Sequence, residues 1–142
     1  MTWGTTSAND YLKLIYTASA IANFADNAAS SPNTNIYVGL HTASPGAGGN
    51  QTTNAAAYTS YARVAVARTS GGWTVSTNTV VPAAQINFAA ATGGSETETF
   101  MGIGTALTST GKLMHFGAVS PSIVVSSGVT PALTVATTVT AT

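Results

Sequence analysis

The chain has 142 residues, of which 6% are charged, and its formal net charge is zero, whereas roughly 25% of residues are charged in an average soluble protein. A neutral chain lacks the basic surface typical of nucleic-acid-binding proteins, and the absence of cysteine excludes disulfides and thiolate metal sites. No apolar run is long enough to span a membrane. We therefore expect no nucleic acid, membrane or cofactor as partner, and a polar, uncharged surface that suits packing against other proteins.

One amphipathic helix is predicted near the N-terminus, over residues 7–26. Ser7 is a candidate cap with Asp10 three residues later, and apolar residues then recur at three- and four-residue spacing from Tyr11 to Ala25. Residues 27–35 contain Asn, Ser and Pro and predict a loop that ends the helix. We expect residues 1–34 to form an arm and a helix, and residues 35–142 to form the β-sandwich of one compact domain.

The rest of the chain predicts about eight short strands separated by Gly, Pro and Asn. We expect Trp73, Ile86 and Phe88 to face the core, and the loop of residues 46–54 to be flexible and exposed. Leu133, Val135 and Val139 are expected to share one face of the last strand. The fold class is therefore mainly β, an antiparallel β-sandwich of the jelly-roll or Greek-key kind with one N-terminal helix. The predicted strands cover residues 35–42, 61–69, 73–80, 84–90, 96–104, 112–119, 122–126 and 132–140.

Two glutamates are the first candidates for chemistry. Glu96 and Glu98 lie two residues apart in a predicted strand, so they project from one face about 6.5–7 Å apart. That separation is compatible with the paired carboxylates of an inverting glycosidase. The favoured interpretation is a solvated strand face, because no aromatic platform for a sugar lies beside them in the sequence.

Two histidines are the other candidates. A zinc site needs three or four ligands, and the chain has few residues that could complete one around His41 or His115. We expect His41 to hydrogen-bond the backbone of the loop that follows its strand, and His115 to face solvent or a subunit contact. The sequence therefore predicts no catalytic, metal-binding or cofactor-binding residue, and a protein that is not an enzyme.

Aromatic and basic side chains are the residues that most often anchor protein interfaces. Trp3 precedes the predicted helix in a polar stretch, where an exposed indole is unfavourable unless it docks on a partner. The candidate partner-contact residues are Trp3, Tyr11, Lys13, Tyr58, Arg63 and Arg68.

Five segments in a fixed order resemble a family of small bacteriophage virion proteins commonly labelled phage tail fibre protein. The most specific pieces are the turn LHTASPG and the succession ATGG, FMGIG and GKLMHFGAV, while Ala89 and Met101 depart from the usual Pro and Phe. The resemblance implies a structural component of the virion, assembled in the host bacterial cytoplasm, and carries over no catalytic residue. The segments are NIYVGLHTASPG (35–46), YARVAVAR (61–68), INFAAATGG (86–94), FMGIGTALTSTGKLMHFGAV (100–119) and GVTPALTVATTVT (128–140).

Two functions fit a virion protein of this size. The main hypothesis is an external capsid decoration or cement subunit that stabilises the head lattice. The alternative is a tail-fibre or tail-tip module that contacts the host surface through loop 44–58. Either would have other virion proteins as partners, the major capsid protein or tail proteins, together with copies of itself. A glycan-cleaving enzyme that uses Glu96 and Glu98 is the least favoured hypothesis.

Overall fold

The computed structural model describes residues 5–20 and 33–141, with side chains from residue 8 onward. Trp3 and the predicted helical residues 21–26 lie outside the described residues. The described chain forms two compact units, and it passes from one to the other at residues 35–36, 66–67, 86–87 and 132–133. Unit 1 contains the segments up to Asn35, from Ala67 to Ile86 and from Leu133 onward, and unit 2 contains Ile36–Val66 and Asn87–Ala132.

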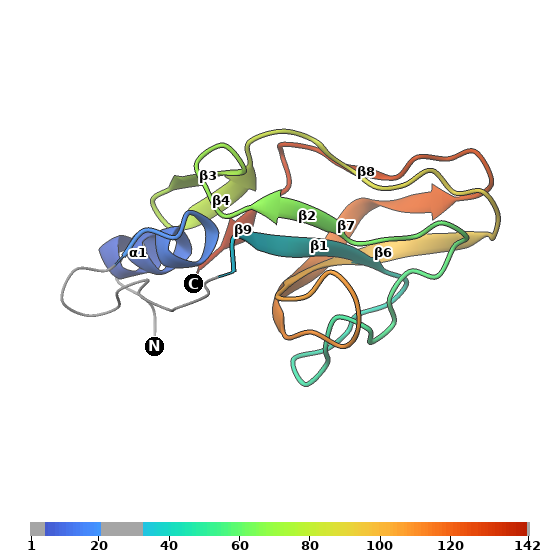
Figure 1. The fold of residues 1–142 in the computed structure, drawn as a ribbon, viewed down its shortest axis with the longest axis horizontal. Coiled ribbons are helices and arrows are strands. Elements are labelled where there is room, and N and C mark those ends of the chain that lie inside the picture. The colour runs from blue at the N-terminus through green and yellow to red at the C-terminus, as the bar shows by residue number, and fades with distance from the viewer. Residues whose placement is uncertain (1–4, 21–32, 142) are drawn as a thin grey trace. The chain divides into compact units, whose positions relative to one another are not determined.

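Most of the regular structure is β, with one helix at the N-terminal end, so the predicted fold class is confirmed. The order of the strands is β2-β1-β6-β7 in a four-stranded sheet, β3-β4-β9 in a three-stranded sheet and β5-β8 in a two-stranded ladder (Figure 1). The elements are α1 (Thr5–Tyr16), β1 (Asn35–His41), β2 (Val64–Ala67), β3 (Trp73–Ser76), β4 (Thr79–Pro82), β5 (Ile86–Asn87), β6 (Glu96–Gly104), β7 (Leu113–Val125), β8 (Ala132–Leu133) and β9 (Val139–Thr140).

Several predicted strands differ in extent from the observed ones. The predicted strand over residues 73–80 is instead the hairpin of β3 and β4, because Thr77 adopts a left-handed conformation with φ 51° that turns the chain. The predicted strands over 112–119 and 122–126 are joined in β7. The last predicted strand is reduced to β8 and β9, and Val135 between them is 52% exposed whereas Leu133 is buried, so the prediction that these residues share one face is wrong for Val135.

Unit 1 is built around the packing of α1 against β3 and β4 (Figure 1). Trp73 at the start of β3 is buried, as predicted, and its ring meets that of Tyr16 edge to face with centroids 4.7 Å apart. Leu12, one turn earlier on α1, is also fully buried. Aromatic burial against one face of the helix therefore holds α1 on the β3–β4 hairpin.

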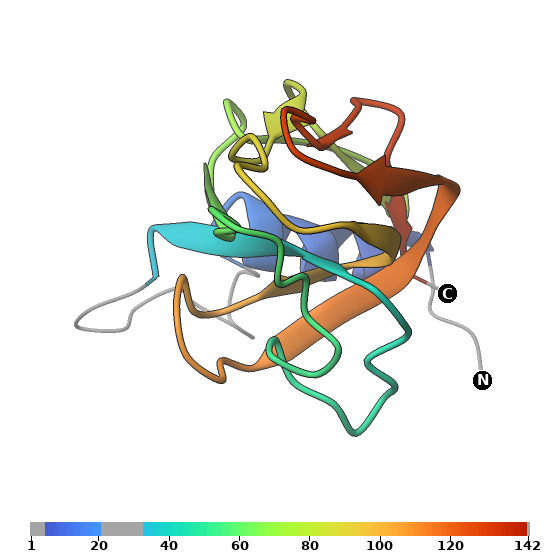
Figure 2. The same cartoon turned by 90° about the vertical axis from the view of Figure 1, so that its right-hand side faces the viewer.

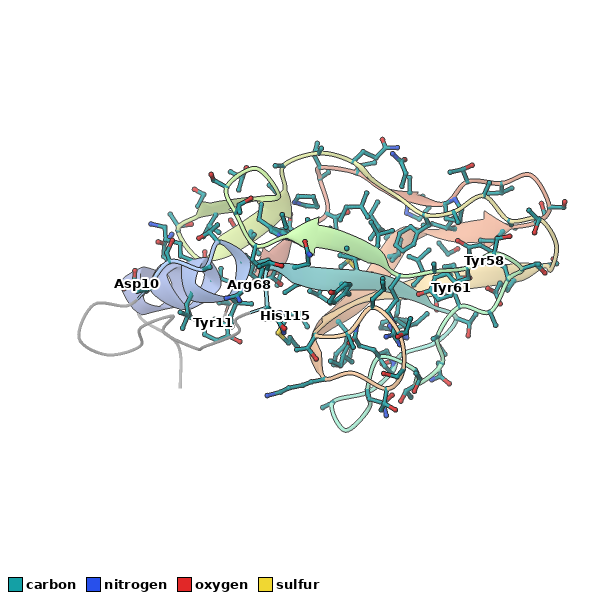
Figure 3. The ribbon with its side chains drawn as sticks, viewed as in Figure 1. Asp10, Tyr11, Tyr58, Tyr61, Arg68 and His115 are labelled. Carbon is teal, nitrogen blue, oxygen red and sulfur yellow. The ribbon has the colours of Figure 1, made fainter. Side chains whose placement is uncertain are left out.

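The helix begins two residues before the predicted Ser7 cap and ends at Tyr16, ten residues before the predicted end. Ala18 adopts a left-handed conformation with φ 54°, which stops helix propagation. The side chain of Arg68 donates hydrogen bonds to the carbonyls of Leu14 and Ile15, at 2.7 and 2.6 Å, and to the carbonyl of Asn33 at 2.7 Å. Figure 3 shows Arg68 at this end of α1. A distant guanidinium thus satisfies carbonyls that a helix end leaves without partners.

Unit 2 is centred on the antiparallel pair of β1 and β6. Val38, Leu40 and Ile103 on these strands are fully buried, and Gly39 lies opposite Gly102. The paired glycines leave room above the backbone, and the Tyr61 hydroxyl fills part of it while it accepts a hydrogen bond from the N–H of Leu40 at 2.9 Å. The Tyr61 side chain therefore packs closely against the sheet at Gly39.

The strand β7 forms one edge of the four-stranded sheet and follows β6 along most of its length (Figure 2). The register runs from Gly104↔Leu113 to Phe100↔Ala118 and resumes at Glu98↔Ile123. Residues 119–122 therefore bulge out opposite Thr99 and contain a cis peptide bond before Pro121. The bulge divides β7 into a longer segment, residues 113–118, and a shorter one, residues 123–125.

No helix among the described residues combines the length and the apolar character that crossing a bilayer requires.

Candidate functional site

Two loops of unit 2, which follow the C-terminal ends of the antiparallel strands β1 and β6, come to lie side by side (Figure 2). Loop A, residues 42–61, follows β1, and loop B, residues 105–112, connects β6 to β7. The Gln51 N–H donates to the Thr110 carbonyl at 3.1 Å and thereby joins the two loops through their backbones. Loop A contains the segment 44–58 for which the sequence predicts recognition.

The buried guanidinium of Arg63 binds the backbones of both loops. Arg63 is 9% exposed and donates hydrogen bonds to the carbonyls of Gln51, Ala106 and Ser109 at 2.8–2.9 Å. Burial lowers the pKa of Arg63, yet an arginine keeps its charge near neutral pH. Hydrogen bonds from a charged donor are roughly twice as strong as neutral ones, so Arg63 fixes the two loops together.

The side chain of Gln51 forms a second link between the loops. Gln51 is 2% exposed, and its Oε1 accepts a hydrogen bond from the N–H of Ala106 at 2.9 Å. A Cβ atom on Gly104 or Gly111 would overlap the Gln51 carboxamide, so both positions require glycine. Nothing in the spacing of the sequence singles out Gln51, but Gly102 and Gly104 in the interior of a strand are a signal of close packing by a neighbouring group.

Loop A is further ordered by its own polar residues. His41, the last residue of β1, is buried. Its Nδ1 lies 2.9 Å from the carbonyl of Thr53, which confirms the predicted contact with the loop backbone. Desolvation by burial lowers the pKa of His41, so the ring is neutral at pH 7. The Asn50 carboxamide accepts from the N–H of Thr52 at 2.9 Å, and Asn54 donates to the Ser44 carbonyl at 2.9 Å. The prediction of a flexible, exposed loop over residues 46–54 is therefore wrong at its centre, where Gln51 is buried and hydrogen bonds hold the backbone.

The outer surface of the loop pair is polar but nearly uncharged. Leu107 is the exposed large hydrophobic residue on it, at 47%, and Lys112 supplies the single formal charge among its exposed side chains. The remaining exposed residues carry hydroxyl, carboxamide or small side chains: Ala43, Ser44, Ala47, Gly48, Thr52, Asn54, Ala57, Thr59, Ser60, Thr108, Ser109 and Thr110.

The two glutamates lie at the other end of β6, and they differ from the predicted solvated face. Oε1 of Glu96 accepts hydrogen bonds from the N–H groups of Ala57 and Tyr58, both at 2.8 Å, so Glu96 holds the last part of loop A. Glu98 is fully buried, and neither of its carboxyl oxygens has a hydrogen-bond partner among the described residues. Burial raises the pKa of Glu98 to about 8, and the nearby Glu96 carboxylate adds to this increase. Glu98 is therefore protonated at neutral pH.

Aromatic residues surround this carboxyl pair. Tyr58 and Tyr61 lie side by side, edge to face with centroids 5.3 Å apart (Figure 3), and Tyr61 stacks on Phe88 at 6.4 Å. The Tyr58 hydroxyl donates to the carbonyl of Ala89 at 3.0 Å, and burial raises the pKa of Tyr58 to about 12. Tyr58 is 3% exposed, so its hydroxyl and ring are committed to the interior of unit 2.

The structure describes five of the six predicted partner-contact residues, three in unit 1 and two in unit 2. Trp3 is outside the described residues, Tyr58 and Arg63 are buried in unit 2, and Arg68 binds the end of α1. Tyr11 is half-buried and Lys13 exposed on α1. His115, a second candidate, is half-buried on β7, and burial lowers its pKa. Among the described residues no three His, Asp or Glu side chains gather into a metal site.

Comparison with known proteins identifies the family. No curated protein matches the chain significantly. A family model described as Podophage GP4 fiber I protein gp80 matches residues 14–140, which is most of the chain and includes both loops and all nine strands. The match supports the resemblance to phage tail-fibre proteins and a structural role in the virion. The chain therefore belongs to the family of Podophage GP4 fiber I protein gp80.

Proposed function

We propose that the chain is a tail-fibre component of a bacteriophage virion and that it contacts the host surface through loops A and B. The family supports a fibre in preference to the capsid decoration that was our main hypothesis from the sequence. The observation that carries the proposal is the pair of loops fixed from behind by Arg63 and Gln51. A binding surface loses less conformational entropy on binding when its loops are already ordered.

The chemistry of the exposed loop residues defines the class of ligand. Hydroxyl and carboxamide groups can donate and accept hydrogen bonds, and the exposed Leu107 is followed in loop B by the exposed hydroxyl residues Thr108, Ser109 and Thr110. A surface with a single lysine has little attraction for a highly charged polymer. We therefore assign the loop pair to a neutral, hydroxyl-rich component of the host surface, with other tail proteins as the remaining partners of the chain.

The proposed role involves no catalysis. Glu96 is engaged by two backbone N–H groups, and Glu98 is buried with its carboxyl group protonated at neutral pH. A glycosidase pair needs one carboxylate and one carboxylic acid that both reach the scissile bond. Full burial of Glu98 supports a non-enzymatic role.

The location on the particle is tested by immunogold labelling of purified virions with antibodies against the chain. We expect gold at the tail and few copies per particle, while labelling distributed over the head would overturn the fibre proposal in favour of decoration.

Host contact is tested separately by competition for adsorption. Purified chain should slow phage adsorption to host cells, and Leu107→Asp should abolish that effect because it replaces the exposed apolar side chain of loop B with an unpaired charge. Val135→Asp is the matched control, since Val135 is equally exposed but lies in unit 1. Equal loss of competition in both variants, or no competition by the original chain, would contradict the assignment of the loops.

A further inference from the structure

Within the edge of the four-stranded sheet at β7, residues 113–118 lack the usual protection against pairing with another strand, whereas Pro121 and the bulge at residues 119–122 protect the part that follows. β7 is the last strand of the sheet, so no strand of the described chain pairs with its outer side. Natural edge strands are protected by charged side chains, especially lysine, or by very short length. β7 spans 13 residues and contains no Asp, Glu, Lys or Arg.

The side chains beside this edge are apolar and exposed. Phe116 is 40% exposed, and Ala118, two residues along the same face of β7, is also exposed. Phe100 lies opposite Ala118 on β6 and is only partly buried, which extends the apolar surface inward from the edge. An incoming strand would therefore gain both main-chain hydrogen bonds and apolar contacts, the two components of strand addition.

The sequence of the edge indicates which strand would pair with it. Residues 113–119, LMHFGAV, form a seven-residue segment with no formal charge, no proline and one glycine. Segments of this length and composition pair readily with identical copies. Burial lowers the pKa of His115, so the one ionisable group in the segment is also neutral at pH 7. Two copies of the segment can therefore pair without repulsion between like charges.

The neighbouring bulge limits the length of the paired segment. Residues 119–122 depart from the ladder with β6, so a regular edge extends over residues 113–118 and ends at the bulge. An antiparallel pair of two such segments centred on Phe116 would place Lys112 opposite the partner's Ser120, and no like charges would meet. Antiparallel pairing of identical strands generates a closed twofold dimer.

We propose that the β7 edge, over residues 113–118, is the surface on which a second copy of this chain docks by antiparallel strand pairing. The two sheets then continue across a twofold axis, with the Phe116 side chains of both copies in contact. This inference concerns association of the chain in solution and stands independently of whether the protein lies on the tail or the head of the virion.

Sedimentation of the purified full chain over a range of concentrations provides the first test. We expect a monomer–dimer equilibrium, and Phe116→Lys should raise the dimer dissociation constant at least about tenfold, because two lysines then meet across the axis and two apolar rings are lost. Val135→Lys makes the same chemical change at an exposed valine of unit 1 and should leave the constant unchanged. A chain that remains monomeric, or a dimer equally sensitive to both variants, would overturn the proposal.

Cross-linking locates the contact, since the chain has no cysteine of its own. Ala118→Cys places a single thiol on the exposed edge; in a pair centred on Phe116 the two copies of residue 118 lie four residues apart along the strands, about 13 Å, so a bismaleimide with a spacer of about that length should link them. Ala136→Cys, at an exposed alanine of unit 1, is the matched control. We expect cross-linked dimers from the first variant alone, and equal yields from both variants would refute pairing at β7. A fold check by circular dichroism on each variant separates loss of pairing from loss of structure.

Discussion

Glu98 shows at the scale of a single residue how the interior of unit 2 depends on protonation. Its carboxyl group is fully buried without a hydrogen-bond partner among the described residues, and its pKa is raised to about 8. In the unfolded chain a glutamate titrates near its ordinary value of about 4.3. The folded state therefore retains the proton over a pH range in which the unfolded state releases it.

We predict that this proton makes stability fall as the pH rises. Because the folded pKa is raised, the contribution of Glu98 is fully present below about pH 4.3 and is lost progressively until about pH 8. Glu98→Gln removes the titrating group. As the pH rises from 5 to 9, the unfolding free energy of the variant should therefore increase relative to that of the original chain by a few kcal/mol. The size follows from a contribution on the order of 1.4 kcal/mol per unit of difference between the folded and unfolded pKa.

Urea unfolding at several pH values, with Asp10→Asn as a second carboxylate-to-amide variant, measures this difference. His41 and His115 have lowered pKa values and destabilise the folded state at acid pH, in the opposite sense to Glu98. Their contributions cancel in the comparison between variant and original chain. A difference that stays constant with pH would show that Glu98 is ionised in the folded state.

Gly102 is a second position of this kind, because the packing around it leaves no room for a Cβ atom. An added Cβ would lie 2.6 Å from Nε2 of His41 and 2.8 Å from Cδ1 of Leu113. We predict that Gly102→Ala lowers the free energy of unfolding by about 1–3 kcal/mol, as overpacking of a filled interior does. Gly48→Ala in loop A is the control, because its Cβ meets nothing within 4 Å and Gly48 lies outside the β7 edge. Thermal or urea unfolding compares the two, and equal stabilities would mean that His41 moves aside at little cost.

At the scale of elements, the end of α1 is determined by a residue more than fifty positions away. Arg68 supplies donors to the carbonyls of Leu14 and Ile15, and its own N–H donates to the Thr34 carbonyl at 2.9 Å. Helical periodicity continues in the sequence beyond Tyr16, so the sequence predicted a longer helix. The guanidinium and the left-handed Ala18 make an earlier end favourable.

We predict that Arg68→Met frays the last turn of α1 and lowers stability by about 1–3 kcal/mol, because partly buried carbonyls lose charged donors. The loss should appear as weaker ellipticity at the helix band in far-ultraviolet circular dichroism. Arg68→Lys keeps the charge but cannot present a planar fork to several carbonyls, so it should recover only part of the stability. Lys112→Met, at an exposed lysine of unit 2, controls for loss of charge alone, and an equal effect there would contradict the capping role.

At the scale of the whole molecule, low charge has two different consequences. Within the fold, three charged side chains form hydrogen bonds with backbone groups far away in the sequence. Arg63 joins loops A and B, Arg68 binds the end of α1, and Glu96 binds the backbone of Ala57 and Tyr58. On the exterior, the scarcity of charge leaves the β7 edge unprotected, and the adsorption and sedimentation experiments above test what each surface contacts. A protein that assembles on a particle can carry such surfaces because its partners cover them.

The sequence by itself determined the fold class, the burial of Trp73, Ile86 and Phe88, the contact of His41 with its loop and the resemblance to a phage fibre family. These follow from local alternation, turn residues and ordered motifs, which act over a few neighbouring positions. Only the tertiary structure decided the end of α1, the burial of Arg63 and Glu98 and the ordering of loop A by Gln51. These depend on hydrogen bonds and close contacts between residues far apart in the chain, and a single sequence does not display such pairs.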